Sequence, residues 1–302
     1  MDSDPPPLPQ LATFVAVLDE GSFEAAARWL AVSPPAVSQR IRALEAGLGQ
    51  VLIQRVIPPE PTRAGQRLLP YARRILALAA EAANAAQGVM LSGAVQLPLA
   101  VNADSLSTWF MGALAAYPQR AEVRFHVERV DQDLAAQALA SGRVLGAVSA
   151  SDQAAPGCVA RRLGVMRYVP VAAPSFVEEH GLNPGRAGTG ARLEAVPMVD
   201  YDADDTLQLD FLEDWLGRKA CPSPHRFPDS PAFIRAMESG LGWGLISEDQ
   251  GREALAAGRL VTLSATRHHD VELYWHQWDL TTAAVEGFGR HLVGYAGAAL
   301  RR

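Results

Sequence analysis

One helical stretch of the sequence carries polar side chains on a face that its packing does not need. Residues 33–48 read SPPAVSQRIRALEAGL. The apolar positions that recur there at helical spacing are Val37, Ile41, Leu44 and Leu48. The opposite face carries Pro35, Ser38, Gln39 and Arg42. Glutamine and arginine side chains pair with base edges in the DNA major groove, so this face could read a DNA sequence. Taken alone, the pattern fits a helix-turn-helix and an ordinary helical hairpin with a solvated polar face about equally well.

A second set of polar residues could bind a small zwitterion. The segment VNADSLST at 101–108 lies where an expected strand leads into a helix, and free N–H groups at a helix N-terminus can hold a carboxylate. Aspartates accept hydrogen bonds from ammonium or guanidinium groups. The candidate effector-binding residues are Asn102, Ala103, Asp104, Ser105, Ser149, Asp202, Asp205 and Ser230. The alternative is that Asp104 and Ser105 only cap the helix and that the acidic loop at 201–205 is solvated.

Other side chains that could do chemistry lack partners at an informative spacing. His276 has no accompanying nucleophile or second acid, and His268 and His269 have no Cys or carboxylate spacing that completes a zinc site. The segment GLGWG at 240–244 lacks the GK[ST] ending of a phosphate-binding loop. The sequence therefore predicts neither an enzyme nor a bound metal or cofactor.

The first polar set lies in a pair of short helices. Ser22 is a good N-cap for the first of them. The apolar stripe expected on that helix is Ala25, Ala26, Trp29 and Leu30. Ser33 caps the second helix, and Pro34 occupies its first position, where a missing N–H costs nothing. Two helices joined by a tight turn, the second with an exposed polar edge, are typical of a helix-turn-helix.

The segment after this hairpin favours the DNA-binding interpretation. Residues 51–62, VLIQRVIPPEPT, predict a short strand, a proline-rich tip and a return, which together form a wing. Arg55 on the wing can reach a DNA phosphate. Thr62 then caps a long helix that ends near Gly88. The C-terminal half of this helix is mostly alanine and leucine, so it implies a partner helix.

This N-terminal quarter resembles that of the LysR-type transcriptional regulators. The residues that carry the resemblance are Phe14, Gly21, Ser22, Phe23, Ala26, Ala27, Leu30, Ser33, Ala36, Val37, Ser38, Ile41, Leu44, Glu45, Gly49, Leu52, Arg55, Thr62 and Gly65. With the resemblance, the exposed helix face is expected to contact double-stranded DNA. The expected DNA-binding residues are Ser33, Pro35, Ser38, Gln39, Arg40, Arg42 and Arg55.

The remaining two thirds of the chain alternate strand-like and helix-like patterns, which predicts an α/β architecture with mainly parallel sheets. In the LysR family this region is a two-lobed effector domain that resembles periplasmic solute-binding proteins, with a ligand cleft between two sheets linked by two crossovers. The expected divisions are a winged helix-turn-helix at 1–62, a linker and dimerisation helix with a hinge at 63–93, and an effector-binding domain at 94–302. We name residues 94–164 and 268–302 lobe 1, and residues 165–267 lobe 2.

The effector region is similar to one branch of that family, the ArgP/LysG regulators of basic amino acid export. The matching segments are LAVNADSLSTW at 99–109, GAVSA at 146–150, YDADDTLQ at 201–208 and LYWHQW at 273–278. The resemblance implies L-lysine or L-arginine as effector, control of a basic amino acid exporter gene, a homodimer or homotetramer, and RNA polymerase as a partner. The alternative is a LysR-type regulator with a different small effector.

Composition and charge set outer limits on these expectations. The chain has 302 residues, no apolar run near the ~20 residues of a membrane span, and an acidic, proline-rich start unlike a secretory signal, which argues against an exported solute receptor. Its two cysteines are far apart and expected to be reduced, as in a cytoplasmic protein. The net charge is −6, yet residues 1–90 hold eight arginines and eight acids. A modest local positive face suits selective DNA binding.

Overall fold

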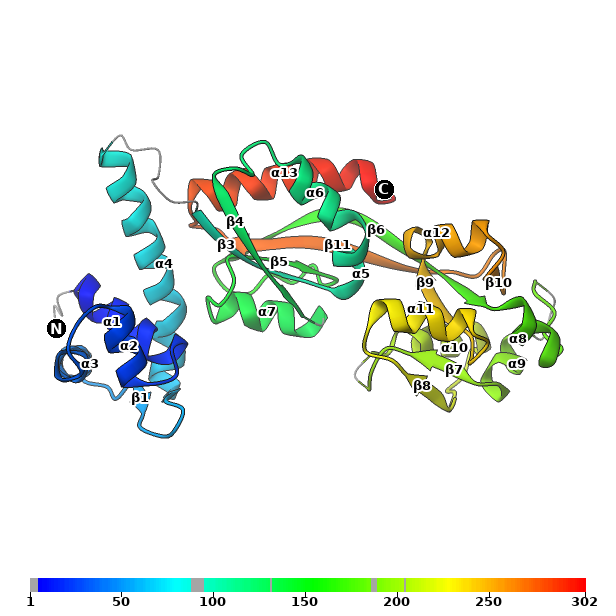
Figure 1. Ribbon diagram of the computed structural model, residues 1–302, viewed down its shortest axis with the longest axis horizontal. Coiled ribbons are helices and arrows are strands. Elements are labelled where there is room, and N and C mark those ends of the chain that lie inside the picture. Colours follow the sequence, from blue (N-terminus) through cyan, green and yellow to red (C-terminus); the bar gives the residue numbers. More distant parts are fainter. Residues whose placement is uncertain (1–4, 88–94, 131, 186–188, 204) are drawn as a thin grey trace.

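The structure, a computed structural model, describes residues 5–87, 95–130, 132–185, 189–203 and 205–302. Figure 1 shows a small helical unit, a long helix, and an elongated α/β region in which two lobes follow one another. The hinge expected at 88–93, after the long helix, lies outside the described residues. No helix in the described ranges is long and apolar enough to cross a membrane.

The helical unit is a winged helix-turn-helix. Its elements are α1 (Leu8–Asp19), α2 (Phe23–Trp29), α3 (Pro34–Leu48), β1 (Ile53–Gln54) and β2 (Glu60–Pro61). The two short strands pair antiparallel and form the predicted wing. The Ser22 hydroxyl accepts a hydrogen bond from the Ala25 N–H at 3.0 Å, which confirms the predicted N-cap. Ser33 occupies the N-cap position of α3 but makes no side-chain capping bond there.

The unit has a hydrophobic core of its own, contributed by α1, α2, α3, the wing and the start of the long helix. The central side chains, all at most 1% exposed, are Leu11, Phe14, Val17, Ala26, Val37, Ile41, Leu44 and Ala72. The apolar stripe predicted on α2 is wrong at Trp29, whose side chain is 67% exposed. Trp29 is the last residue of α2, and the buried residues of that helix are Ala26 and Ala27.

The long helix α4 (Arg63–Gln87) follows the wing and leads toward lobe 1 (Figure 1). The Thr62 hydroxyl accepts from the Gly65 N–H at 3.1 Å, as a helix cap does. The Arg74 guanidinium lies 4.2 Å from the ring centroid of Trp278. Arg73 pairs with Asp19 of α1 and donates to the Ser141 carbonyl at 3.0 Å. This helix therefore contacts both the helical unit and lobe 1.

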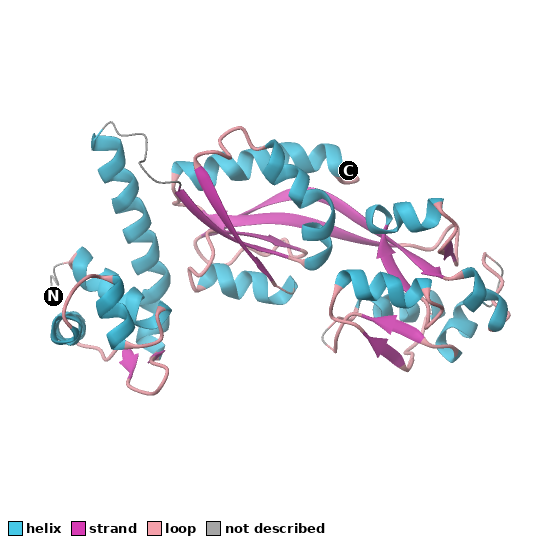
Figure 2. Cartoon of the chain, viewed as in Figure 1, coloured by secondary structure: helices cyan, strands magenta, loops and turns pink. Residues whose placement is uncertain are grey.

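Lobe 1 is a sheet covered by helices on both faces, with α6 and α13 on one side and α7 on the other (Figure 2). Its strands are β3 (Val95–Val101), β4 (Val123–Arg129), β5 (Gly146–Ser149), β6 (Cys158–Ala172) and β11 (His269–Trp278). Its helices are α5 (Ala103–Ser105), the π-helical turn η1 (Leu106–Phe110), α6 (Met111–Ala116), α7 (Gln132–Ala140) and α13 (Ala283–Ala299).

Lobe 2 is built on the far end of β6. Its other strands are β7 (Met198–Asp200), β8 (Pro224–Arg226), β9 (Gly244–Ser247) and β10 (Val261–Thr262). Its helices are α8 (Pro174–Glu179), α9 (Thr189–Ala195), α10 (Leu207–Leu216), α11 (Ser230–Glu238) and α12 (Glu248–Ala256). The buried Trp243 ring donates from Nε1 to the Leu193 carbonyl at 2.9 Å and anchors this lobe's core.

The sheets are mixed, so the prediction of mainly parallel sheets is wrong in detail. Strand β3 pairs parallel with β4 and β5, and β7 pairs parallel with β8. Strands β6 and β11 pair antiparallel with each other, and β9 and β10 pair antiparallel with β6. The two crossovers between the lobes are the long strands themselves, so one sheet runs through both lobes. Alternating elements could not reveal this, because strand direction depends on the path of the connections.

Candidate functional site

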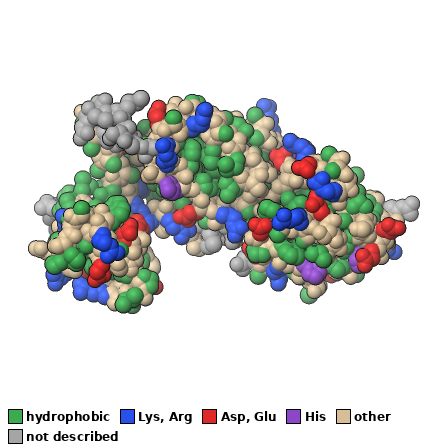
Figure 3. All heavy atoms as spheres, in the orientation of Figure 1, with side chains coloured by type: hydrophobic (Ala, Val, Ile, Leu, Met, Phe, Trp, Pro, Cys, Tyr) green, Lys and Arg blue, Asp and Glu red, His purple; other side chains and the backbone are tan. Residues whose placement is uncertain are grey.

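The DNA-facing residues expected from the sequence lie on α3, at its start and on the wing. Ser33, Pro35, Gln39, Arg42 and Arg55 are exposed. Figure 3 shows arginine side chains, in blue, on the surface of this unit. Because the opposite face of α3 is buried in the core, its packing leaves this edge available to a partner.

Two further residues of that set are half-buried, and one of them has a contact inside the unit. Ser38 is partly covered, and the Arg40 guanidinium lies 3.5 Å from the Thr13 hydroxyl of α1, to which it donates. Glu45 accepts from the Leu52 N–H at 2.8 Å. That bond ties α3 to the residue before the first strand of the wing.

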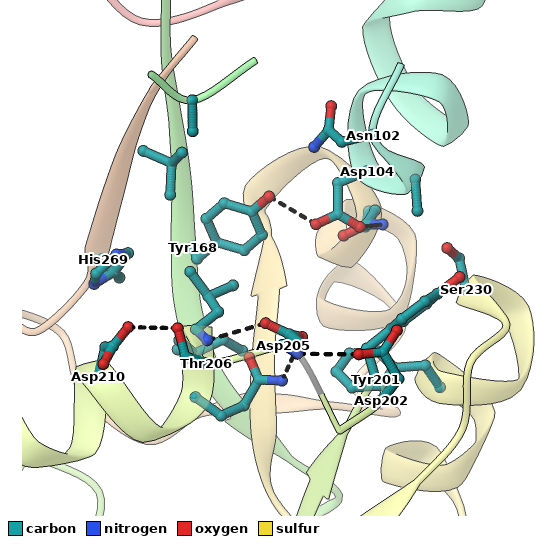
Figure 4. Close-up of a pocket in the computed structure, with 18 of the residues that line it drawn as sticks. Asn102, Asp104, Tyr168, Tyr201, Asp202, Asp205, Thr206, Asp210, Ser230 and His269 are labelled. Carbon is teal, nitrogen blue, oxygen red and sulfur yellow. Dashed lines mark hydrogen bonds between the residues drawn. The ribbon is translucent and has the colours of Figure 1, made fainter. Parts of the chain in front are cut away.

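A cleft of about 870 Å³ lies between the two lobes. The side chains on its wall come from the end of β3, from β6, from the loop before α10, from α11, from α12 and from the start of β11. Figure 4 shows the lobe 1 residues Asn102 and Asp104 facing a row of lobe 2 residues that includes Asp205 and Tyr201. Elements separated by more than 150 positions in the chain therefore contribute to one wall.

Asp104 is half-buried and joins the two lobes through its hydrogen bonds. The Tyr168 hydroxyl donates to Asp104 Oδ2 at 2.6 Å, and the Gln250 amide donates to Oδ1 at 2.8 Å. The same Gln250 amide also donates to the Ser107 hydroxyl at 3.1 Å. Burial raises the pKa of Asp104 above its ordinary value, against the two hydrogen bonds, which lower it. Asp104 thus bonds side chains outside lobe 1 on both of its oxygens.

A second acidic group lies on the lobe 2 wall. The buried Gln208 amide donates to Asp200 Oδ1 at 2.8 Å and to Asp205 Oδ2 at 3.2 Å. Asp205 also accepts from the Leu207 N–H at 3.0 Å, at the start of α10. Burial, with the nearby charge of Asp205, raises the pKa of Asp200 to about 6. Burial likewise raises the pKa of Asp205.

The cleft wall is acidic. The carboxylates on it are Asp104, Asp202, Asp205, Asp210, Asp270 and Glu272, while none of the wall residues that the structure describes is Lys or Arg. Asp270 forms two hydrogen bonds with Arg167, each 2.7 Å long, and Glu272 pairs with Arg162 at 3.3 Å, so arginines outside the cleft compensate these two. Asp104, Asp205 and Asp210 have no such ion pair among the described side chains. Their negative potential favours a cationic ligand.

The predicted effector residues separate into two groups in the structure. Those on the cleft wall are Asn102, Ala103, Asp104, Asp202, Asp205 and Ser230. Ser105 is fully buried and does not reach the wall, and its hydroxyl has no partner among the described residues. Ser149 is also buried, and its hydroxyl accepts from the Ser151 N–H at 3.2 Å. Asp204, the remaining acid of the YDADD loop, lies outside the described residues.

Several wall residues were not among the sequence candidates. They are Tyr168, Tyr201, Gln208, Gln250 and His269. For Gln250 a local signal existed, because the SEDQ at 247–250 is a capping box in which Gln250 follows the Ser247 cap by three positions. Nothing local, however, relates Gln250 to Asp104, which precedes it by 146 residues. Arg129 at the end of β4 crosses between the lobes and donates to the Tyr201 hydroxyl at 2.6 Å.

The remaining reactive side chains have structural contacts. His276 is buried, its Nε2 lies 2.7 Å from the Ser151 carbonyl oxygen, and burial lowers its pKa. His268 lies 3.6 Å from Asp270. Within the described ranges no group of three or more His, Cys, Asp or Glu side chains is arranged to hold a metal ion.

Comparison with known families and proteins gives matches to two family models and to full-length relatives. Residues 8–66 match the family model of the bacterial regulatory helix-turn-helix protein of the lysR family. Residues 94–296 match the model of the LysR substrate binding domain. The HTH-type transcriptional regulator ArgP of Pseudomonas aeruginosa is 37% identical over 97% of this chain and 96% of its own length.

Two solved structures extend the likeness to three dimensions. The crystal structure of ArgP from Mycobacterium tuberculosis has a TM-score of 0.87 and 35% identity, covering 97% of this chain and 98% of that one. Full-length LysG from Corynebacterium glutamicum with bound effector Arg has a TM-score of 0.78 and 31% identity, covering 98% of this chain and all of that one.

Proposed function

Because this chain belongs to the family of LysR-type transcriptional regulators, we propose that α3 and the wing bind operator DNA and that the cleft between the lobes binds L-lysine or L-arginine. The residues assigned to DNA are Ser33, Pro35, Ser38, Gln39, Arg40, Arg42 and Arg55. Gln39 and Arg42 on the exposed edge read bases, and Arg55 on the wing contacts a phosphate.

The observation that carries the effector assignment is the acidic wall of the cleft. Asp104, Asp205 and Asp210 line the cavity without a compensating arginine among the described side chains, and a ligand that enters displaces the water that screens their charges. A neutral amino acid would leave these groups unpaired, which costs free energy, whereas a side-chain ammonium or guanidinium group supplies the missing positive charge. The relative from C. glutamicum, whose structure contains bound Arg as effector, supports the same class of ligand.

The regulator acts as an oligomer and divides into three parts in this proposal. Residues 1–62 bind DNA, residues 63–93 pair with the same helix of a second copy, and residues 94–302 bind the effector. On α4, Tyr71 and Ile75 are exposed apolar side chains that such pairing covers. A homodimer or homotetramer places two units on two half-sites and meets RNA polymerase at the promoter of a basic amino acid exporter gene. The chain catalyses no reaction in this role.

A gel-shift assay on the DNA upstream of the protein's own gene tests the proposal. We expect the purified chain to shift this fragment in excess random DNA, and L-lysine or L-arginine at millimolar concentration to change the mobility or the affinity of the complex. Norleucine, which is lysine without its side-chain ammonium group, serves as the matched control. A complex that forms equally on random DNA contradicts the operator assignment, and a complex indifferent to both basic amino acids contradicts the effector assignment.

A further inference from the structure

The cleft has a buried amide on each of its two sides whose carbonyl oxygen has no hydrogen-bond partner among the described residues. Asn102 of lobe 1 is 6% exposed and Gln208 of lobe 2 is 1% exposed, and both line the cleft. The atoms without partners are Asn102 Oδ1 and Gln208 Oε1. A buried acceptor left unpaired costs free energy, so each oxygen calls for a donor that the described side chains do not supply.

The chemistry around Gln208 fixes which end of its amide is the nitrogen and which is the oxygen. Its Nε2 donates to Asp200 and Asp205 at 2.8 and 3.2 Å, and ionised carboxylates only accept hydrogen bonds. The opposite orientation of the amide would place its oxygen against two carboxylate oxygens. Oε1 is therefore held as an acceptor, and its missing partner is an N–H or O–H group.

The two sides of the cleft differ in what else they offer a ligand. Beside Gln208, the lobe 2 wall carries Asp202 and Asp205, which would repel a carboxylate. Beside Asn102, the chain turns into the helical segment 103–116, whose first N–H groups can donate hydrogen bonds to a carboxylate. An amino acid that satisfies both orphaned oxygens thus has its α-amino and α-carboxyl groups at lobe 1 and its side-chain cation at lobe 2.

We infer that Gln208 is a specificity-determining residue that accepts a hydrogen bond from the side-chain cation of the effector, while Asn102 accepts from its α-ammonium group. This inference rests on the proposed function and adds to it a ligand orientation and a residue for each end. Gln208 also holds Asp200 and Asp205 in place, so it positions the carboxylates that meet the same cation.

Calorimetric titration of the full chain with L-lysine and norleucine separates the two roles. Norleucine keeps the α-amino and α-carboxyl groups of lysine and lacks only its ammonium. We expect Gln208→Met, which keeps the volume of the side chain, to weaken lysine binding about 10- to 100-fold, the loss of a hydrogen bond to a charged group. The same variant should leave norleucine binding within about threefold, which also shows that its cleft is intact. Asn102→Ala should weaken both ligands by a similar factor.

Matched controls and the opposite outcomes make the test decisive. Gln137 is an exposed glutamine on α7, so Gln137→Met makes the same chemical change away from the cleft and should alter neither affinity. Equal losses for lysine and norleucine in Gln208→Met would overturn the inference, as would unchanged lysine binding there. If Gln208→Met does not fold, Asn102→Ala tests the inference by itself. A loss of affinity for lysine but not for norleucine in that variant would place the side-chain cation at Asn102 and would refute the proposed orientation. Failure of the unaltered chain to bind either basic amino acid would refute the proposed function itself.

Discussion

The DNA-binding unit and the effector cleft hold their polar groups in opposite surroundings. Gln39, Arg42 and Arg55 are exposed on the outside of a small core to which they contribute little. Asp104, by contrast, is half-buried and Gln208 is buried, and both are bonded to side chains from other elements. A surface that reads DNA needs side chains free to meet an external partner. A cleft that selects a small cation needs polar groups that are held in place before the ligand enters. Ordering these side chains during binding would cost free energy.

The difference extends to how each region is stabilised. The DNA-binding unit has one hydrophobic cluster, formed by residues up to Leu76, and the effector region has three separate ones. The link between them is α4, through contacts such as Arg74 over Trp278. Trp278 ends β11, whose other end, at His269, lies on the cleft wall. One strand therefore spans the distance from the effector site to the helix that supports the DNA-binding unit.

The largest effect is expected from breaking one core while leaving the other intact. Ile41 is 1% exposed at the centre of the DNA-binding unit, so Ile41→Ala should lower that unit's free energy of unfolding by about 2–5 kcal/mol. Chemical denaturation followed by circular dichroism measures this loss. Ile57→Ala makes the same change at a fully exposed position on the wing and should have almost no effect on stability. Loss of lysine binding in Ile41→Ala would show that the two regions do not fold independently.

A smaller effect is expected from the exposed edge of α3. A glutamine that pairs with adenine discriminates against the wrong base by about 1–3 kcal/mol, so Gln39→Ala should lower operator affinity by that amount and leave random-DNA affinity unchanged. Arg55→Ala should weaken operator and random DNA about equally, because a phosphate contact carries no sequence information. Fluorescence anisotropy at fixed salt on both DNAs measures the ratio. Equal losses on both DNAs for Gln39→Ala would rule out base reading by this residue.

The smallest effect is a pH dependence that only the buried region should show. Protonation of Asp200, whose pKa is about 6, removes a negative charge beside Asp205, so cation binding weakens as pH falls through 6. The dissociation constant of L-lysine should rise up to about tenfold between pH 8 and pH 5. Calorimetry across this range measures it, and the salt concentration stays fixed as the control. An affinity that is constant from pH 8 to pH 5 would contradict a role for this cluster in binding.

The free chain should respond to pH in the opposite direction at the same group. Because the folded-state pKa of Asp200 lies above its unfolded value of 3.8, the folded state binds the proton more tightly. The stability that this group contributes is fully present below about pH 4 and is lost as pH rises through 6. Thermal melts of Asp200→Asn beside the unaltered chain isolate this contribution.

The sequence alone determined the DNA-binding unit almost completely, since its signals are local. The caps at Ser22 and Thr62, the buried Val37 and Ile41 and the wing depend on spacings of a few residues, which helix and hairpin geometry fixes. Two expectations fail, because Trp29 is exposed and Ser33 makes no capping bond, and residue spacing alone reports neither exposure nor hydrogen bonding.

For the effector region, the sequence alone determined the α/β character and the segments that supply Asn102, Asp104 and Asp205. Tertiary structure decided which side chains meet, because Tyr168 and Gln250 reach Asp104 from positions 64 and 146 residues away. Tertiary structure also buries Ser105 and Ser149 away from the cleft wall. The local sequence pattern cannot distinguish a buried serine near a strand end from an exposed one. The physical reason is that burial and pairing of polar groups depend on how the long strands β6 and β11 carry the two lobes against each other.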